Sequence, residues 1–211
     1  MARITGPVCR LCRREGLKLF LKGQRCDSPK CAIERRPQPP GMQATGRRSK
    51  PTDYGIHLRE KQKVKHYYGV LERQFRNYFA RASRMTGNTG DNLMSLLERR
   101  LDNVVHRMGF GLSRAQARQL VAHGHVVVNG RRTDIPSFLV QPGDEIVIKN
   151  RPKSVQLVQG NLSEFHHAVP DFLSRDEGAE IPSGRVVRLP MPEDTSVPEL
   201  QANLIVELCS K

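Results

Sequence analysis

Four of the five cysteines in this chain lie close together near its start. They are separated by two, thirteen and four residues, at Cys9, Cys12, Cys26 and Cys31. Two thiolates with two residues between them can bind one ion from a tight turn, and a second pair completes a tetrahedron. Because four thiolates fill the coordination shell, no position remains for water or substrate. The spacing therefore predicts one structural zinc ion, and an iron–sulfur cluster that would use the same ligands is the less favoured alternative.

The segment that carries these cysteines, residues 1–36, is short and polar. Burial of apolar side chains alone would not fold it, whereas zinc binding would supply about 10–16 kcal/mol. In a reducing cytosol metal binding is favoured over disulfides, and unligated or redox-active thiols are the remaining alternative. We therefore expect a zinc knuckle at residues 1–36, in which neighbouring basic side chains favour the thiolate form.

The positive charge of the chain is concentrated in its first half. The 211 residues carry a net charge of +14, divided as +15 in residues 1–90, +2 in 91–150 and −3 in 151–211. A solvated protein surface usually mixes both signs, so this one-sided excess indicates a polyanionic partner. Aromatic residues make up only 5% and Trp is absent, which favours folded RNA over a single strand stacked on aromatic side chains.

An acidic membrane is the other polyanion that such a charge could attract. No stretch of the sequence approaches the roughly 18 consecutive apolar residues of a spanning helix. The first residues, MARITGPVCR, also lack the apolar core of a secretory signal. We expect a cytoplasmic protein that binds no membrane.

Residues 37–53 are rich in proline and glycine, which predicts an extended basic arm that follows a phosphate backbone, or else a solvated linker. Residues 41–48 resemble a nucleotide-binding phosphate loop. However, Arg47 and Arg48 stand where that motif requires Lys and then Ser or Thr, and no strand precedes them. The sequence therefore predicts no nucleotide site in this arm.

Two helices are expected after the arm. From Tyr54 to Arg84 apolar residues recur mostly at steps of three, four or seven, with Lys and Arg on the remaining faces. A second helix is expected from Asp91, its predicted N-cap, to Met108. Their apolar faces form a core, and their basic faces are candidates for phosphate contacts.

A compact module is expected at residues 99–150. Ser113 is the predicted N-cap of a short helix on which Arg114 and Arg118, one turn apart, share an outer face. Asn129-Gly130 predicts a tight hairpin turn after the strand 126–128, and a further strand is expected at 145–148. A basic helix beside a basic hairpin can straddle an RNA groove.

This module resembles the RNA-binding domain shared by small-subunit ribosomal protein four, certain pseudouridine synthases and tyrosyl-tRNA synthetases. The matching residues are Arg100, Leu101, Asp102, Ser113, Arg114, Ala117, Arg118, Val128, Asn129, Gly130, Pro136, Gly143 and Asp144. Outside the module, the chain resembles the bacterial small-subunit ribosomal protein four family, of the universal uS-four group and its zinc-binding type. The segments that carry this resemblance are the four-cysteine start, DYGIHLREKQKVKHYYGVLERQFRNYF, NTGDNLMSLLERRLDNVVHRMGFG and LIVELCSK. The likeness covers nearly the whole chain.

The resemblance implies a structural constituent of the small ribosomal subunit. It implies primary binding to a multi-helix junction in the five-prime region of the small-subunit rRNA, which nucleates assembly. It also implies contacts with ribosomal protein five that influence translational accuracy, and a position of the basic arm near the mRNA entrance. No catalytic residues and no small-molecule substrate are expected.

The expected fold class is α+β, and the chain begins with a zinc knuckle and an arm. A discontinuous helical domain is expected at 54–98 plus 151–211, with a strand at 204–208 near its end. The module at 99–150 is inserted into this domain and consists of helices on a small, mainly antiparallel sheet. The predicted RNA contacts are Arg3, Arg10, Arg13, Arg14, Arg47, Arg48, Lys50, Tyr54, Arg59, Lys61, Lys63, Lys65, Arg73, Arg76, Arg100, Ser113, Arg114, Gln116, Arg118, Asn129, Arg131 and Arg132.

Two alternatives belong to other functional classes. An RNA-modifying enzyme could use the same module for docking, but only about sixty residues follow it, fewer than the 100–150 of a typical catalytic domain. A zinc-dependent DNA-binding regulator would share the cysteines and the charge, but would present a helix that reads bases in the major groove. Turnover assays and binding to rRNA against duplex DNA separate these alternatives.

Overall fold

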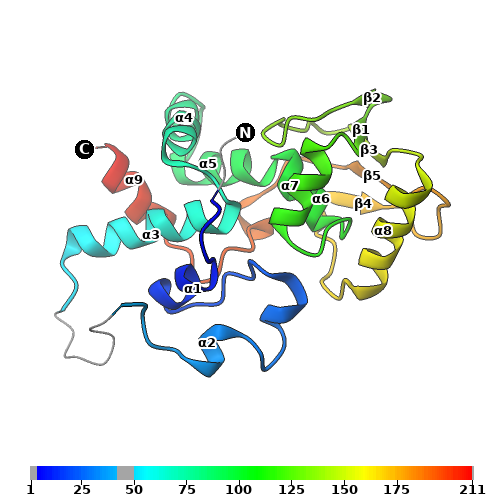
Figure 1. Ribbon diagram of the computed structural model, residues 1–211. Helices are drawn as coiled ribbons and strands as arrows, with labels where there is room; N and C mark the ends of the chain where they lie inside the picture. Colours follow the sequence, from blue (N-terminus) through cyan, green and yellow to red (C-terminus); the bar gives the residue numbers. More distant parts are fainter. Residues whose placement is uncertain (1–3, 42–49, 211) are drawn as a thin grey trace. The chain divides into compact units, whose positions relative to one another are not determined.

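The computed structural model describes residues 4–41 and 50–210. The chain forms two compact units: unit 1 comprises Met1–Leu93 and Ser196–Lys211, and unit 2 comprises Met94–Thr195 (Figure 1). Unit 1 is therefore discontinuous in sequence, and its last segment returns after unit 2 is complete.

Unit 1 is helical throughout its described residues. Its elements are α1 (Cys9–Glu15), the 3-10 turn η1 (Gly23–Cys26), α2 (Ala32–Arg35), α3 (Asp53–Tyr68), α4 (Glu72–Ala82), the first part of α5 (Thr89–Glu98) and α9 (Ala202–Ser210). Val64, Phe75 and Ala82 are fully buried and form part of its core. The basic side chains of α3 and α4 thus extend from an apolar interior.

The helix expected from Tyr54 to Arg84 is in fact two helices. Thr52 caps α3 by accepting a hydrogen bond from the Gly55 N–H at 3.2 Å. Gly69 ends it with a left-handed backbone (φ 63°), a conformation that glycine adopts at little cost. The apolar spacing continues across this break into α4, which is why periodicity alone did not locate it.

The strand expected at residues 204–208 is wrong, because this segment is the helix α9. Leu204, Ile205 and Leu208 have the spacing of one helix face, and Ile205 is fully buried. Helix α9 packs against α3 within unit 1. The C-terminal segment therefore belongs to the helical core of that unit.

Unit 2 places helices beside a five-stranded antiparallel sheet with strand order β2-β1-β3-β5-β4. Its elements after α5 are α6 (Leu101–Arg107), α7 (Arg114–Ala122), β1 (Val126–Val128), β2 (Arg131–Arg132), β3 (Glu145–Ile148), α8 (Pro152–Glu164), β4 (Leu173–Arg175), β5 (Ser183–Val186) and the 3-10 turn η2 (Pro192–Asp194). The helices and the sheet share one core, which includes Leu101, Val104, Met108, Phe110, Val126, Ile146, Ile148 and Phe172. The predicted α+β class is confirmed.

Local signals in the module are confirmed by the structure. Ser113 caps α7 by accepting from the Gln116 N–H at 3.3 Å. Asn129 and Gly130 have positive φ angles of 49° and 76°, as a tight hairpin turn between β1 and β2 requires. At the preceding junction helix α5 begins at Thr89, and the side chain of Asn88, not that of the predicted Asp91, caps it by accepting from the Gly90 N–H at 2.8 Å.

Residues 151–195 differ from the predicted assignment to the helical domain. They lie in unit 2, where β5 pairs with β3 through Ile146 and Gly184, and Phe172 is fully buried in the core. Strand β5 has the sequence SGRV, so it is poor in the β-branched and aromatic residues that signal a strand. Strand β3 pairs with β1 along one edge, and β5 satisfies the backbone groups of its other edge, so this pairing determines the extended conformation of β5.

We predict that Gly184→Ala destabilises unit 2 by about 1–3 kcal/mol, because the new methyl group would lie 2.6 Å from the backbone oxygen of Ser174. Gly160→Ala is the control, since Gly160 lies in α8 with open space around it and should gain up to about 1 kcal/mol. Urea unfolding of the full chain measures both. Equal stability of Gly184→Ala and the wild type would contradict this packing.

Candidate nucleic-acid interface

The four N-terminal cysteines share one neighbourhood in unit 1. Cys12, Cys26 and Cys31 are buried and Cys9 is half-buried. Burial raises the pKa of the Cys12 thiol, a hydrogen bond from the Leu19 backbone opposes this, and the three other cysteines raise it further. The Lys22 N–H donates to Cys26 Sγ at 3.4 Å. Backbone donors aimed at two sulfurs are features that a thiolate site uses.

The described residues contain no assembled metal site. Among residues 4–41 and 50–210, which include all five cysteines, no three His, Cys, Asp or Glu side chains form a group that could hold a metal. The donor type, burial and backbone hydrogen bonds fit a thiolate-bound metal, but the spacing of the side chains does not show one. The predicted zinc knuckle therefore stays a prediction.

The cysteine segment is attached to α3 through a buried carboxylate. Glu15, at the end of α1, has a side chain that is only 3% exposed and lies 3.2 Å from Arg59 Nη1. His66 Nδ1 lies 3.7 Å from the same carboxylate oxygen. Arg59 is therefore engaged in holding α1 against α3, although it was predicted as an RNA contact.

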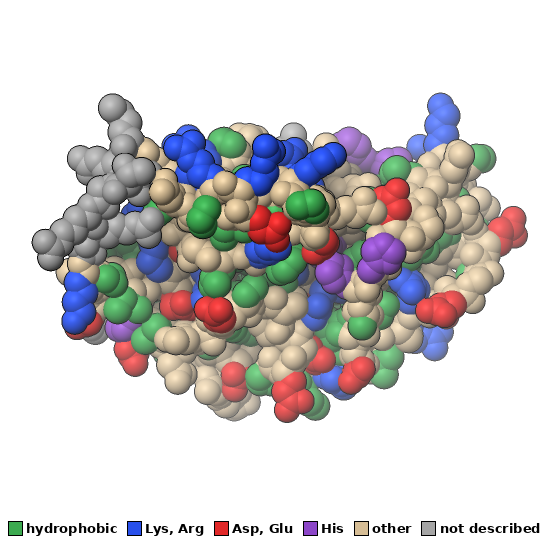
Figure 2. Space-filling model, turned by 90° about the horizontal axis from the view of Figure 1, so that it is seen from below, with side chains coloured by type: hydrophobic (Ala, Val, Ile, Leu, Met, Phe, Trp, Pro, Cys, Tyr) green, Lys and Arg blue, Asp and Glu red, His purple; other side chains and the backbone are tan. Residues whose placement is uncertain are grey.

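Helix α4 presents an exposed basic face. Arg73 and Arg81 on this helix and Arg84 just after it are exposed, and no ion pair involving them is found among the described residues. Arg76 is 76% exposed and pairs with Glu72 at 3.2 Å. Figure 2 looks at the molecule from below and so draws a different side, on which several further Lys and Arg side chains lie close together. The exposed basic face of α4 is available to a polyanion.

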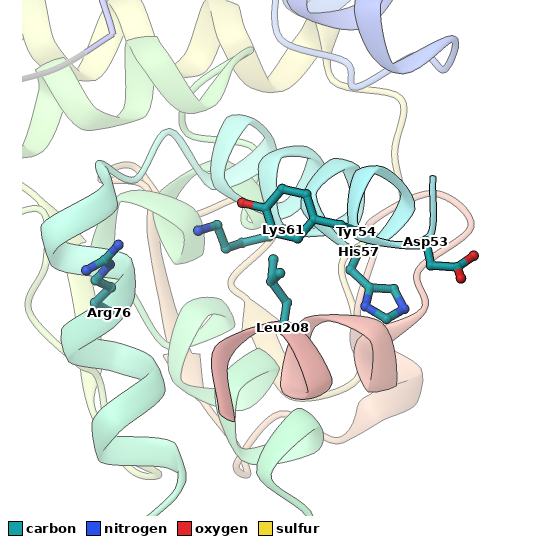
Figure 3. A pocket seen from close by; sticks show the side chains of 6 residues that line it. All are labelled: Asp53, Tyr54, His57, Lys61, Arg76 and Leu208. Atoms are coloured by element: carbon teal, nitrogen blue, oxygen red, sulfur yellow. The ribbon is translucent and has the colours of Figure 1, made fainter. Parts of the chain in front are cut away.

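A pocket of about 390 Å³ lies beside this face, between α3, α4 and α9 (Figure 3). Three of the predicted RNA contacts line it: Tyr54 and Lys61 on α3 and Arg76 on α4. The full lining is Asp53, Tyr54, His57, Lys61, Arg76 and Leu208. Tyr54 is 66% exposed, so its ring is open to solvent. An aromatic ring beside two cations is an arrangement that suits a nucleotide.

Glu72 moderates the charge of this region. Burial opposes its ionisation, but hydrogen bonds from Lys61, Lys65 and Arg76 lower the pKa of its carboxyl to about 2. Lys61 and Lys65 lie 2.8 Å and 2.6 Å from its two oxygens. Three cations share one carboxylate, so a net positive charge remains.

In unit 2 a buried ion-pair network fixes the start of α6. Arg100 is fully buried, and its Nε and Nη2 donate to the two oxygens of Asp102 at 3.0 Å and 2.6 Å. Arg118 Nη1 donates to Asp102 Oδ2 at 2.9 Å and so ties α7 to the same carboxylate. A bidentate pair of this kind is specific in geometry, and the removal of one partner leaves an uncompensated charge.

A second network lies beside the first. Asn103 donates to Glu98 Oε2 at 2.7 Å and accepts from Arg114 Nε at 3.0 Å. His106 Nδ1 lies 2.8 Å from the Gly111 carbonyl oxygen, and burial together with Arg114 lowers the pKa of His106 to about 3. The imidazole is neutral at physiological pH, so this side chain packs and does not carry charge.

Three predicted RNA contacts are not supported by this structure, because their side chains are buried. Arg100 is 0% exposed, Arg114 8% and Lys63 4%. Lys63 Nζ donates to Glu60 and to the Glu199 carbonyl oxygen, both at 2.7 Å, and so joins α3 to the C-terminal segment of unit 1. Arg114 and Arg118 do share a helix face, but it faces Asn103 and Asp102 instead of solvent.

The remaining predicted contacts are placed as follows. Exposed side chains are Arg10, Arg14, Lys50, Tyr54, Arg73, Arg76, Asn129, Arg131 and Arg132. Partly buried side chains are Arg13, Arg59, Lys61, Lys65, Ser113, Gln116 and Arg118. Arg3, Arg47 and Arg48 lie outside the described residues. The exposed set is the stronger group of candidates, because phosphate contact requires an accessible cation.

Sequence reasoning missed a basic cluster in unit 2. His123 and His125 follow the end of α7, with ring centroids 6.2 Å apart. Arg132, Lys149 and Arg151 lie near enough to influence the His125 imidazole. These residues come from separate segments, so only the fold brings them together, and no spacing in the sequence could have identified them.

Comparisons with known proteins agree with this architecture. Residues 3–98 match the family described as "Ribosomal protein S4/S9 N-terminal domain", and residues 99–146 match the "S4 domain". Proteins named "Small ribosomal subunit protein uS4" are similar over 100% of both chains: 56% identical in Thermoanaerobacter sp. (strain X514), 55% in Trichlorobacter lovleyi and 53% in Thermus thermophilus. The match includes both units.

The fold and the exposed basic surfaces define an RNA-binding protein built around an S4 domain. Within that class, the chain belongs to the small ribosomal subunit protein uS4 family. Its role is that of a structural protein of the small subunit in the cytoplasmic ribosome, and this family is not enzymatic. Across the described ranges, no helix has both the length and the apolar character needed to cross a bilayer.

We predict that Asp102→Asn destabilises unit 2 by about 3–5 kcal/mol, because it removes the carboxylate that faces the buried Arg100. Asp134→Asn is the matched control, since Asp134 is exposed and should change stability by less than about 0.5 kcal/mol. Hydrogen exchange of the α6 and α7 amides measures the effect by unit. A loss below about 1 kcal/mol in Asp102→Asn would show that the pair is not structural.

Proposed function

We propose that this chain is a primary rRNA-binding protein that nucleates assembly of the small subunit at a multi-helix junction in the five-prime region of the rRNA. The observation that carries the proposal is exposed cationic charge on α4 in unit 1 and on the β1–β2 hairpin in unit 2, most of it without an ion-pair partner among the described residues. Two separate basic surfaces on one chain suit RNA segments that converge. Backbone phosphates fix position and register in such contacts.

Finer partners follow from the family and stay proposals. We propose contacts with ribosomal protein five, an influence on translational accuracy, and a position of the basic arm near the mRNA entrance. Support comes from the family assignment, and from the segment of unit 2 that follows β5, where Val187, Leu189 and Met191 are exposed apolar residues suited to a protein neighbour.

We also propose that Cys9, Cys12, Cys26 and Cys31 hold one structural zinc ion. The donor set, the burial of three thiols and the backbone hydrogen bonds to Cys12 and Cys26 support it. Bound zinc would crosslink the segment that Glu15 holds against α3, and would take no part in chemistry.

The rRNA-binding proposal predicts a specific salt dependence. Arg73→Gln combined with Arg81→Gln should weaken binding to an rRNA fragment of the five-prime junction, and should reduce the slope of log K against log salt by about 2. Arg185→Gln, exposed on β5 outside both surfaces, should leave the slope unchanged. Filter binding over a series of salt concentrations measures the slopes.

Duplex DNA of equal length is the competitor in this assay. Binding to the rRNA fragment should be much tighter at every salt concentration, because the protein recognises a folded RNA. Equal affinity for duplex DNA would contradict the proposal and would favour the DNA-binding regulator.

The zinc proposal predicts about one zinc per chain in freshly purified protein, by elemental analysis. Cys12→Ser with Cys26→Ser should abolish it and expose the amides of α1 to exchange, whereas Cys209→Ser should retain the metal. Unit 2 should be unaffected in all variants. Zinc near zero with protected α1 amides, or stoichiometric iron and sulfide, would overturn the assignment.

A further inference from the structure

Five basic side chains gather at one place in unit 2. They are His123 at the end of α7, His125, Arg132 on β2, Lys149 after β3 and Arg151 at the start of α8. We call these five residues the histidine cluster. No ion pair involving any of them is found within the described ranges, although several other arginines of unit 2 pair with carboxylates.

The backbone holds this cluster together. The Lys149 N–H donates to the His125 carbonyl oxygen at 2.8 Å, which joins the end of β3 to the start of β1. The guanidinium of Arg132 lies directly over Gly124, where an added Cβ would lie 2.2 Å from its Nε. Gly124 therefore provides the space that lets Arg132 approach the two histidines.

The rest of the surroundings adds further positive potential. His125 Nδ1 lies 3.0 Å from Oγ of the buried Ser154, which holds the ring in place. The N-terminus of α8, a helix of 13 residues, is at the same position and contributes its partial positive charge. The charged groups that act most strongly on His125 are thus the other four members of the cluster, and Ser154 is its hydrogen-bond partner.

We propose that the histidine cluster binds a phosphodiester of the rRNA and takes up a proton when it does so. The cations Arg132, Lys149 and Arg151 and the two imidazoles converge from three stretches of the chain and are complementary to a phosphate, and His123, Arg132 and Arg151 are exposed enough to reach one. An acidic protein segment is the other anion of suitable charge; the phosphate is favoured because this cluster adjoins the exposed hairpin residue Arg131. The inference rests on the proposed rRNA binding.

The direction of proton uptake follows from the electrostatics of the free protein. Burial lowers the pKa of His125, and His123, Arg151, Lys149 and Arg132 lower it further. A bound phosphate would place a negative charge beside the ring and raise that pKa again. Proton uptake on binding makes the affinity rise as pH falls, by up to about tenfold per pH unit for one proton.

The test measures binding of the full chain to the rRNA junction fragment at about pH 6 and about pH 8, on either side of the ordinary histidine pKa. The wild type should bind about three- to tenfold more tightly at the lower pH. His123→Gln with His125→Gln should lose most of this difference. His166→Gln with His167→Gln, an exposed pair in the same unit, is the matched control and should keep it. The control also accounts for titration of the RNA itself.

A second measurement needs no variant at the cluster. Imidazole pKa values from NMR in the free and rRNA-bound wild type should show that of His125 rising on binding. An unchanged His125 pKa, or an equal pH dependence of rRNA binding in the wild type and the cluster variant, would overturn the inference. The same binding measurement with an acidic peptide in place of the rRNA fragment tests the other anion, and a pH dependence seen only with the peptide would also overturn the inference. If the wild type fails to bind rRNA at either pH, the proposed function itself fails.

Discussion

Positive charge that the chain does not neutralise is the constraint on which the rest of this structure depends. The net charge is +14, yet the interior admits a cation only where a carboxylate, an amide or a carbonyl oxygen receives it. The fold separates two populations of basic residues as a result. Arg100, Arg114 and Lys63 are buried with partners and hold elements together, whereas the arginines of α4 and of the β1–β2 hairpin remain exposed.

The buried population explains how a small module keeps its surface in place. Asp102 receives Arg100 from the start of α6 and Arg118 from α7, so one carboxylate sets the relation of two helices. The surrounding apolar core leaves Arg100 and Asp102 little access to water. A rigid module of this kind presents its hairpin in a fixed geometry, which is what recognition of an RNA backbone requires.

Much of this could be predicted from the sequence. The Ser113 cap, the Asn129-Gly130 turn and the strand 145–148 follow from local chemistry and were predicted correctly. Tertiary effects could not be predicted: the polar strand β5 exists because β3 needs a partner, and the terminal segment is a helix because α3 covers it. For the same reason the sequence did not distinguish buried arginines from exposed ones: Arg114 and Arg81, for example, both lie on amphipathic helices.

Exposed cations are what hold this chain on folded rRNA. Co-sedimentation with small ribosomal subunits through a high-salt wash tests it most directly, because nonspecific phosphate contacts weaken steeply with salt. We predict that the chain stays with the small subunit at a stoichiometry of one copy per particle. Release of the chain during the wash, together with ordinary binding to any polyanion at low salt, would contradict it.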